Sequence, residues 1–164
     1  MTRPHADVEL AIFRSDQSLL HRHFRGWTFE KIVDGQGQVW SETERLELPV
    51  HEIHARSTDG PPRAIEFLLN ERDADNWIFR RDSSITLKLH RAVVRSAAGL
   101  PVLAPEVVLL FKAKSPRAKD ECDFRSACAA MNASQRQWLR DGIAVCHPGH
   151  SWLESLGTGI YGNA

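Results

Sequence analysis

Cysteine is scarce in this chain of 164 residues, and the three that occur, Cys122, Cys128 and Cys146, form no C-x-x-C motif. An odd number of cysteines with this spacing argues against a disulfide framework and against a thiolate zinc site. We expect all three to behave as small buried hydrophobic residues.

Long apolar runs are also missing. No stretch approaches the roughly 20 apolar residues that a bilayer-spanning helix needs, and the first residues, MTRPHAD, lack the apolar core of a signal peptide. The sequence therefore predicts a cytoplasmic protein without a membrane partner.

Neither sign of charge is in excess, because 21 lysines and arginines balance 21 aspartates and glutamates. Without a basic surplus no strong field attracts nucleic acid or anionic membrane, so nucleic acid is disfavoured as a partner. The length fits one domain with an adequate core, or one domain with a small helical appendage.

Eight histidines include three close pairs, which raises the question of a metal site. Each pair has a simpler explanation in a solvated helix, a strand edge or a turn, so none is expected to bind zinc. The pairs are His21 with His23, His51 with His54, and His147 with His150.

The first part of the chain, residues 1–102, is predicted to be a region built on a mixed or mostly antiparallel sheet with one early helix. Ser15 can cap that helix, which should run to about Phe24 and stop at Gly26. Alternating apolar segments separated by turn residues predict the strands. The extended segments are WTFEKIV, LPVHEIHAR, RAIEFLLNE, NWIFRR and ITLKLHRAVV, and DGQGQVW is a hairpin turn.

The second part, residues 103–164, is predicted to be a helical region packed on the first as one compact unit, which makes the fold class α+β. Pro105 suits the first turn of a helix that should end near Lys114. A second helix is expected from Lys119, and Ser134 with Gln137 forms a capping box for a third.

Acidic residues alternate with apolar ones near the start of the chain. In PHADVELAIFR, a strand would place Asp7 and Glu9 on one face. Glu66 lies between apolar neighbours in RAIEFLLNE. Three carboxylates on neighbouring strands are hard oxygen ligands suited to Mg²⁺ or Mn²⁺. The pattern indicates phosphoryl or nucleotidyl transfer, although the same alternation is typical of any half-exposed strand.

Four further segments follow one another along the chain as TRPHADVEL, WIFRRD, LPVLAPEVVLLFKAKSPRAKDECDF and PGHSWLESL. With the acidic pair, the third acid and the C-terminal helices, they resemble the bacterial aminoglycoside 2''-adenylyltransferase-like family of the nucleotidyltransferase superfamily. The resemblance covers nearly the whole chain, and its most specific element is LAPEVVLLFKAK followed by KDECDF.

The resemblance implies a transferase that moves a nucleoside monophosphate from a nucleoside triphosphate to a hydroxyl of a small-molecule acceptor. It implies that Asp7 and Glu9 hold catalytic Mg²⁺ ions, with Glu66 as third carboxylate and base for the acceptor hydroxyl. Such ions stabilise both the attacking and the leaving oxygens during transfer. Neither the nucleotide nor the acceptor follows from the sequence.

Four cationic side chains are candidates for the phosphates. Lys112 and Lys119 lie on predicted helices, where a flexible ammonium can follow phosphate charge. Lys119 can instead form a helical ion pair with Asp123. Arg3 and His5 precede the acidic pair as in the family, and either contacts phosphate, orients a carboxylate or serves only as a loop contact.

Members of the superfamily usually carry a helix and a glycine motif before the acidic strand, where backbone amides meet the phosphates. Only six residues precede Asp7 here. Three expectations stay open: a start further upstream, a second subunit that covers the gap, or a catalytically degenerate binding or regulatory module. A toxin or antitoxin partner of the nucleotidyltransferase type is one form of such a module. An exposed first strand would also favour a homodimer.

Overall fold

The computed structural model describes residues 8–157, and it divides into two compact units. The first ends at Thr86 and the second begins at Leu87. This division precedes residue 102, where the sequence places the change to helices, because β8 (Val93–Arg95) and β9 (Pro101–Leu103) pair with each other in a separate hairpin. Packing of both parts as one unit stays a prediction.

The first unit is built on a sheet whose strands follow the order β3-β2-β4-β5-β6. These neighbours are antiparallel, whereas β1 pairs with β5 in parallel. With the helices described below, this sheet confirms the coarse α+β class. The strands are β1 (Glu9–Phe13), β2 (Thr28–Val33), β3 (Gln36–Val39), β4 (Glu52–Arg56), β5 (Ala64–Asp73) and β6 (Asn76–Ile78).

The hairpin between β2 and β3 is confirmed. Val33 is the partner of Gln36, which leaves a two-residue turn. Asp34 has φ 50° and Gly35 has φ 76°. Positive φ at both central residues is the requirement of a type I′ turn, whose twist matches that of the strands it joins.

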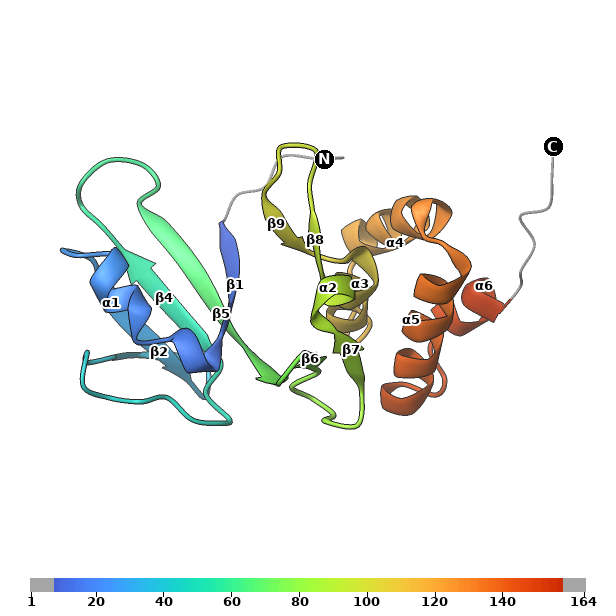
Figure 1. Cartoon of the computed structure of the whole chain (residues 1–164), viewed down its shortest axis with the longest axis horizontal. Helices are drawn as coiled ribbons and strands as arrows, with labels where there is room; N and C mark the ends of the chain where they lie inside the picture. Colours follow the sequence, from blue (N-terminus) through green and yellow to red (C-terminus); the bar gives the residue numbers. More distant parts are fainter. Residues whose placement is uncertain (1–7, 158–164) are drawn as a thin grey trace. The chain divides into compact units, whose positions relative to one another are not determined.

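One face of the sheet is covered by the short helix α1 (Leu19–His23), as Figure 1 shows. Its Leu20 belongs to a core with Phe29, Ile53 and Phe67, all at most 5% exposed. The expected single helix from Ser15 is instead a 3-10 turn, η1 (Arg14–Asp16), followed by α1. The helix ends at His23, before the predicted stop Gly26, which has φ 81° in the turn that leads to β2.

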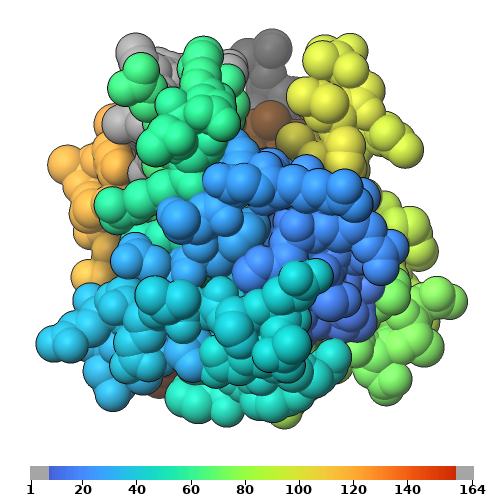
Figure 2. All heavy atoms as spheres, turned by 90° about the vertical axis from the view of Figure 1, so that its left-hand side faces the viewer, coloured from blue at the N-terminus to red at the C-terminus, as the bar shows by residue number. Residues whose placement is uncertain are grey.

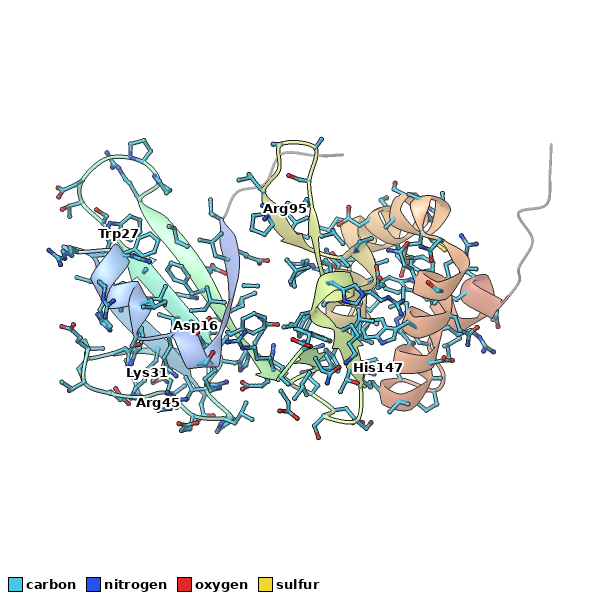
Figure 3. The ribbon with its side chains drawn as sticks, viewed as in Figure 1. Asp16, Trp27, Lys31, Arg45, Arg95 and His147 are labelled. Carbon is cyan, nitrogen blue, oxygen red and sulfur yellow. The ribbon has the colours of Figure 1, made fainter. Side chains whose placement is uncertain are left out.

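The loop between β3 and β4 packs against the same core. Leu46 of this loop is 2% exposed and joins the cluster that contains Leu20, and Figure 2 shows the loop surface beside that of α1. The ammonium of Lys31, labelled in Figure 3, pairs with Glu44 of the loop. This loop thus completes the covered side of the sheet.

The second unit is mainly helical. The predicted helix at Pro105 is confirmed, but the extended segment predicted over ITLKLHRAVV is interrupted by a helical turn. The capping box of the third predicted helix is formed by Asn132 and Gln135, not by Ser134 and Gln137. The elements are β7 (Thr86–Lys88), which begins at the unit boundary, α2 (Leu89–Ala92), α3 (Pro105–Lys112), α4 (Ala118–Ala130), α5 (Ala133–Cys146) and α6 (Trp152–Gly157).

The core of the second unit includes residues of α4 and its C-cap Met131. Phe124, Cys128 and Met131 are all at most 6% exposed. Of the three cysteines predicted to be buried, Cys128 is buried, but Cys122 is exposed and Cys146 is half-buried. The ring of Trp152 from α6 stacks on Phe124 with 4.2 Å between centroids. Over residues 8–157, no helix has both the length and the apolar character needed to cross a membrane.

Candidate functional site

The two predicted site carboxylates that the structure describes, Glu9 and Glu66, are direct register partners in the parallel pair of β1 and β5. Register partners point to the same face of a sheet. Ile65 and Phe67, on either side of Glu66, are buried in the core on the other face. The alternation in the sequence therefore predicted correctly that β5 presents Glu66 away from its apolar neighbours.

The register extends this row of side chains across four strands. His54 in β4 is the partner of Glu66, and Glu30 in β2 is the partner of His54. Glu30, His54, Glu66 and Glu9 thus lie in line on the face opposite the core. Glu52, two residues before His54 in β4, points to the same face.

Three of these side chains form a close group. The Nε2–H of His54 donates a 2.7 Å hydrogen bond to Oε1 of Glu52. One ligand atom from each of Glu52, His54 and Glu66 lies within 4.8 Å of the others. The side chains of His54 and Glu52 are 28% and 33% exposed, so the group is half-buried yet open to a small ion.

Sequence reasoning did not include Glu52 or His54 among the ligands. It explained His54 by a strand edge, which is wrong because β4 lies between β2 and β5. The Glu-x-His spacing in EIH places both side chains on one face, as the Asp-x-Glu spacing does. Only the register with β5 shows that this face is the one that carries Glu66.

Cationic side chains border the group. Burial and, to a smaller extent, neighbouring Arg81 lower the pKa of Arg80 to about 10, while Glu52 opposes the shift. The guanidinium of Arg56 lies 4.0 Å from a carboxylate oxygen of Glu30. The acidic face therefore has positive charge at its margin, where it can attract an anionic ligand.

Three predicted residues, Arg3, His5 and Asp7, lie outside the described residues. Their proposed roles toward phosphate and metal stay predictions. Among the described residues, the structure brings together Glu9 and Glu66 of the predicted carboxylate set.

The two predicted phosphate-binding lysines belong to the second unit. The Nζ of Lys112 forms ion pairs with Asp120 and, at 3.2 Å, with Asp123. Lys119 is exposed in the first turn of α4. Asp120 and Asp123 are thus structural partners of a cation, and the ammonium of Lys112 is engaged by both.

Asp120 is the most strongly perturbed carboxylate of this second unit. Burial alone would raise its pKa, but hydrogen bonds from Arg117 and Lys112 hold the pKa of Asp120 well below its usual range. Its Oδ2 also accepts the backbone N–H of Arg117 at 3.0 Å, which fixes the start of α4. These contacts give Asp120 a structural role at the start of α4.

The other two histidine pairs make ring contacts and a hydrogen bond to the backbone. The ring of His21 lies 4.5 Å from that of Phe29 and 4.4 Å from that of Trp40, centroid to centroid. The Nδ1 of His150 accepts the backbone N–H of Trp152 at 3.0 Å. His21 and His150 thus have structural contacts, and the absence of zinc at both pairs stays a prediction.

Comparisons of the chain with protein-family models, with curated proteins and with solved structures find no match. The nucleotidyltransferase resemblance therefore stays a prediction, and the function has to be argued from the site itself.

Proposed function

We propose that the protein is a metal-dependent nucleotidyltransferase, which moves a nucleoside monophosphate from a nucleoside triphosphate to a hydroxyl of a small molecule. The observation that carries the proposal is the direct register of Glu9 and Glu66 on adjacent parallel strands. This arrangement supports the predicted pairing of acids from the first strand with an acid on a later strand. Asp7, outside the described residues, would complete the set.

The chain's own residues have distinct tasks in this proposal. The carboxylates of Glu9 and Glu66 hold Mg²⁺, which prefers oxygen ligands and supplies charge stabilisation for the transferred phosphoryl group. Glu66 also accepts the proton of the acceptor hydroxyl. Arg80, near Glu52, offers its guanidinium to the phosphates, since a planar fork matches phosphate oxygens.

The proposal is tested by calorimetric titration of a nonhydrolysable nucleoside triphosphate, with and without Mg²⁺. Wild type should bind only with the metal, and Glu9→Gln and Glu66→Gln should each weaken binding at least tenfold. Glu47→Gln is the matched control, because Glu47 lies in a loop, is 66% exposed and pairs with Arg45. Equal binding by wild type and both site variants contradicts the proposal.

A second candidate function is a non-catalytic binding or regulatory module of the same fold. The engagement of Lys112 by Asp120 and Asp123 favours it, because an ammonium held by two carboxylates is less available to a triphosphate. A folded wild type that binds no nucleotide with Mg²⁺ would select this module over the enzyme.

A further inference from the structure

We propose that Glu52, His54 and Glu66 form a cation site that prefers Mn²⁺, Co²⁺ or Zn²⁺ to Mg²⁺. The site shares Glu66 with the proposed transferase site, but it rests on Glu52 and His54 and does not require that transfer takes place. It assigns a transition metal, held in part by an imidazole nitrogen, to a face for which the predicted all-carboxylate set implies Mg²⁺ or Mn²⁺.

The first argument is geometric. Two of the ligands come from β4 and one from the adjacent strand β5, and His54 is the register partner of Glu66. Metal–ligand bonds of about 2.0–2.2 Å place neighbouring ligand atoms on the order of 3–4 Å apart. The three ligand atoms here already lie within 4.8 Å of one another. Small side-chain rotations on two rigid strands therefore bring them onto one ion.

The second argument is the chemistry of the donors. Imidazole nitrogen suits Zn²⁺, Co²⁺ and Mn²⁺, whereas Mg²⁺ strongly prefers oxygen and keeps its water. His54 supplies one nitrogen, and Glu52 and Glu66 supply one oxygen each. The remaining positions stay open to water or to an oxygen of a ligand, as in catalytic rather than structural sites.

The third argument is charge. Two carboxylates and one neutral imidazole carry a formal charge that cancels a divalent cation. Such cancellation matters because the side chains of His54 and Glu52 are mostly covered, at 28% and 33% exposed. The hydrogen bond between these two side chains also limits the rotation of the imidazole before metal arrives.

The experiment is a titration of the full chain with Co²⁺, followed by calorimetry and by visible absorption, and with Mg²⁺ as the competitor. We expect one Co²⁺ per chain, bound more tightly than Mg²⁺. His54→Gln should weaken Co²⁺ binding by about 100-fold, and Glu52→Gln by about 10- to 100-fold. His23→Gln, which changes an exposed histidine of α1, should leave Co²⁺ affinity unchanged.

Equal Co²⁺ affinity in wild type and His54→Gln would overturn the inference, and so would tighter binding of Mg²⁺ than of Co²⁺ by wild type. Thermal unfolding without metal shows whether each variant is folded. Glu9→Gln separates the two proposals, because it should lose nucleotide binding but keep Co²⁺. Co²⁺ binding that depends on His54, in a wild type that binds no nucleotide, supports the metal site and refutes the transferase.

Discussion

The Nε of Arg14 lies 2.6 Å from Oε1 of Glu71, and only 5% of the arginine side chain is exposed. The Nη1 of the same guanidinium donates to the carbonyl oxygens of Leu46, at 3.2 Å, and of Val50, at 2.7 Å. A single side chain thus joins the end of β1 to β5 and to the loop before β4. It fixes the strand that carries Glu9 to the strand that carries Glu66.

Arg14→Met should therefore destabilise the protein. Removal of the guanidinium leaves the largely buried carboxylate of Glu71 and the carbonyl of Val50 without this donor, at a cost of about 3 kcal/mol. The carbonyl of Leu46 keeps a second donor, Nε2 of Gln17, at 3.1 Å. Urea unfolding measures this change. Arg45→Met is the control, because the pair of Arg45 with Glu47 is 62% and 66% exposed and is worth less than about 1 kcal/mol. Similar losses in both variants would show that the Arg14 contacts add nothing specific.

Local patterns in the sequence predict much of this fold. The alternation of buried residues in β5 and the Asp34-Gly35 turn depend on a strand's two-residue period and on backbone conformation. Pro105 at the start of α3 depends on its fixed φ and missing N–H. These features need no knowledge of distant residues, so one sequence is enough to find them.

Other features depend on tertiary contacts, and local sequence patterns do not predict them. The parallel pairing of β1 with β5 and the meeting of His54 with Glu66 are set by register between distant segments. The helical turn α2 interrupts a segment whose β-branched residues favour a strand. The candidate site was therefore predicted in part: Glu9 and Glu66 follow from spacing, whereas Glu52 and His54 join them only through register.

Gly35→Ala should cost about 1–2 kcal/mol through backbone strain alone. Gly35 has φ 76°, and a Cβ added there meets nothing within 4 Å, so no clash contributes. Gly149→Ala is the matched control, since its Cβ also meets nothing within 4 Å and its φ lies outside the left-handed range. In thermal unfolding, the free energy of unfolding of Gly149→Ala should lie within about 0.5 kcal/mol of the wild-type value. A smaller loss at Gly35 than at Gly149 would contradict the role of the type I′ turn.

His150 should make stability fall in mild acid. Burial lowers the pKa of His150 from 6.5, and nearby His147 lowers it further. The unfolded chain therefore takes up a proton at a higher pH than the folded chain does. The contribution of His150 is complete above pH 6.5 and is lost as the pH falls below that value.

The hydrogen bond of His150 depends on pH in the same way, because its Nδ1 accepts the backbone N–H of Trp152. A proton on Nδ1 removes this acceptor. His150→Asn keeps a side-chain acceptor but does not titrate. Urea unfolding between pH 7.5 and 5 should show a shallower fall for this variant than for wild type. Part of the fall in stability should remain in the variant, because burial also lowers the pKa values of His21 and His51. An unchanged slope would contradict the assignment to His150.

Asp120 makes a prediction of the same sign for stronger acid. Its side chain is 2% exposed and pairs with Lys112 and, at 3.0 Å, with Nε of Arg117. Because these cations hold the pKa of Asp120 below its ordinary value of 3.8, its ionised form stabilises the fold above that pH. This stability is lost as the pH falls below 3.8. Asp120→Asn should therefore cost about 3 kcal/mol at pH 7, since it leaves the cations without their buried partner.

The difference between Asp120→Asn and wild type should shrink as the pH falls below 3.8, because wild type then loses the same charge. Asp123→Asn is the control from the same cluster: its side chain is 23% exposed and lies 3.2 Å from Lys112, so its cost at pH 7 should be smaller. Chemical unfolding at pH 7 and pH 3 measures both variants. If Asp120→Asn were as stable as wild type at pH 7, the carboxylate of Asp120 would not be what holds Lys112 and the start of α4 together. Lys112 would then be available for the phosphate role predicted from the sequence.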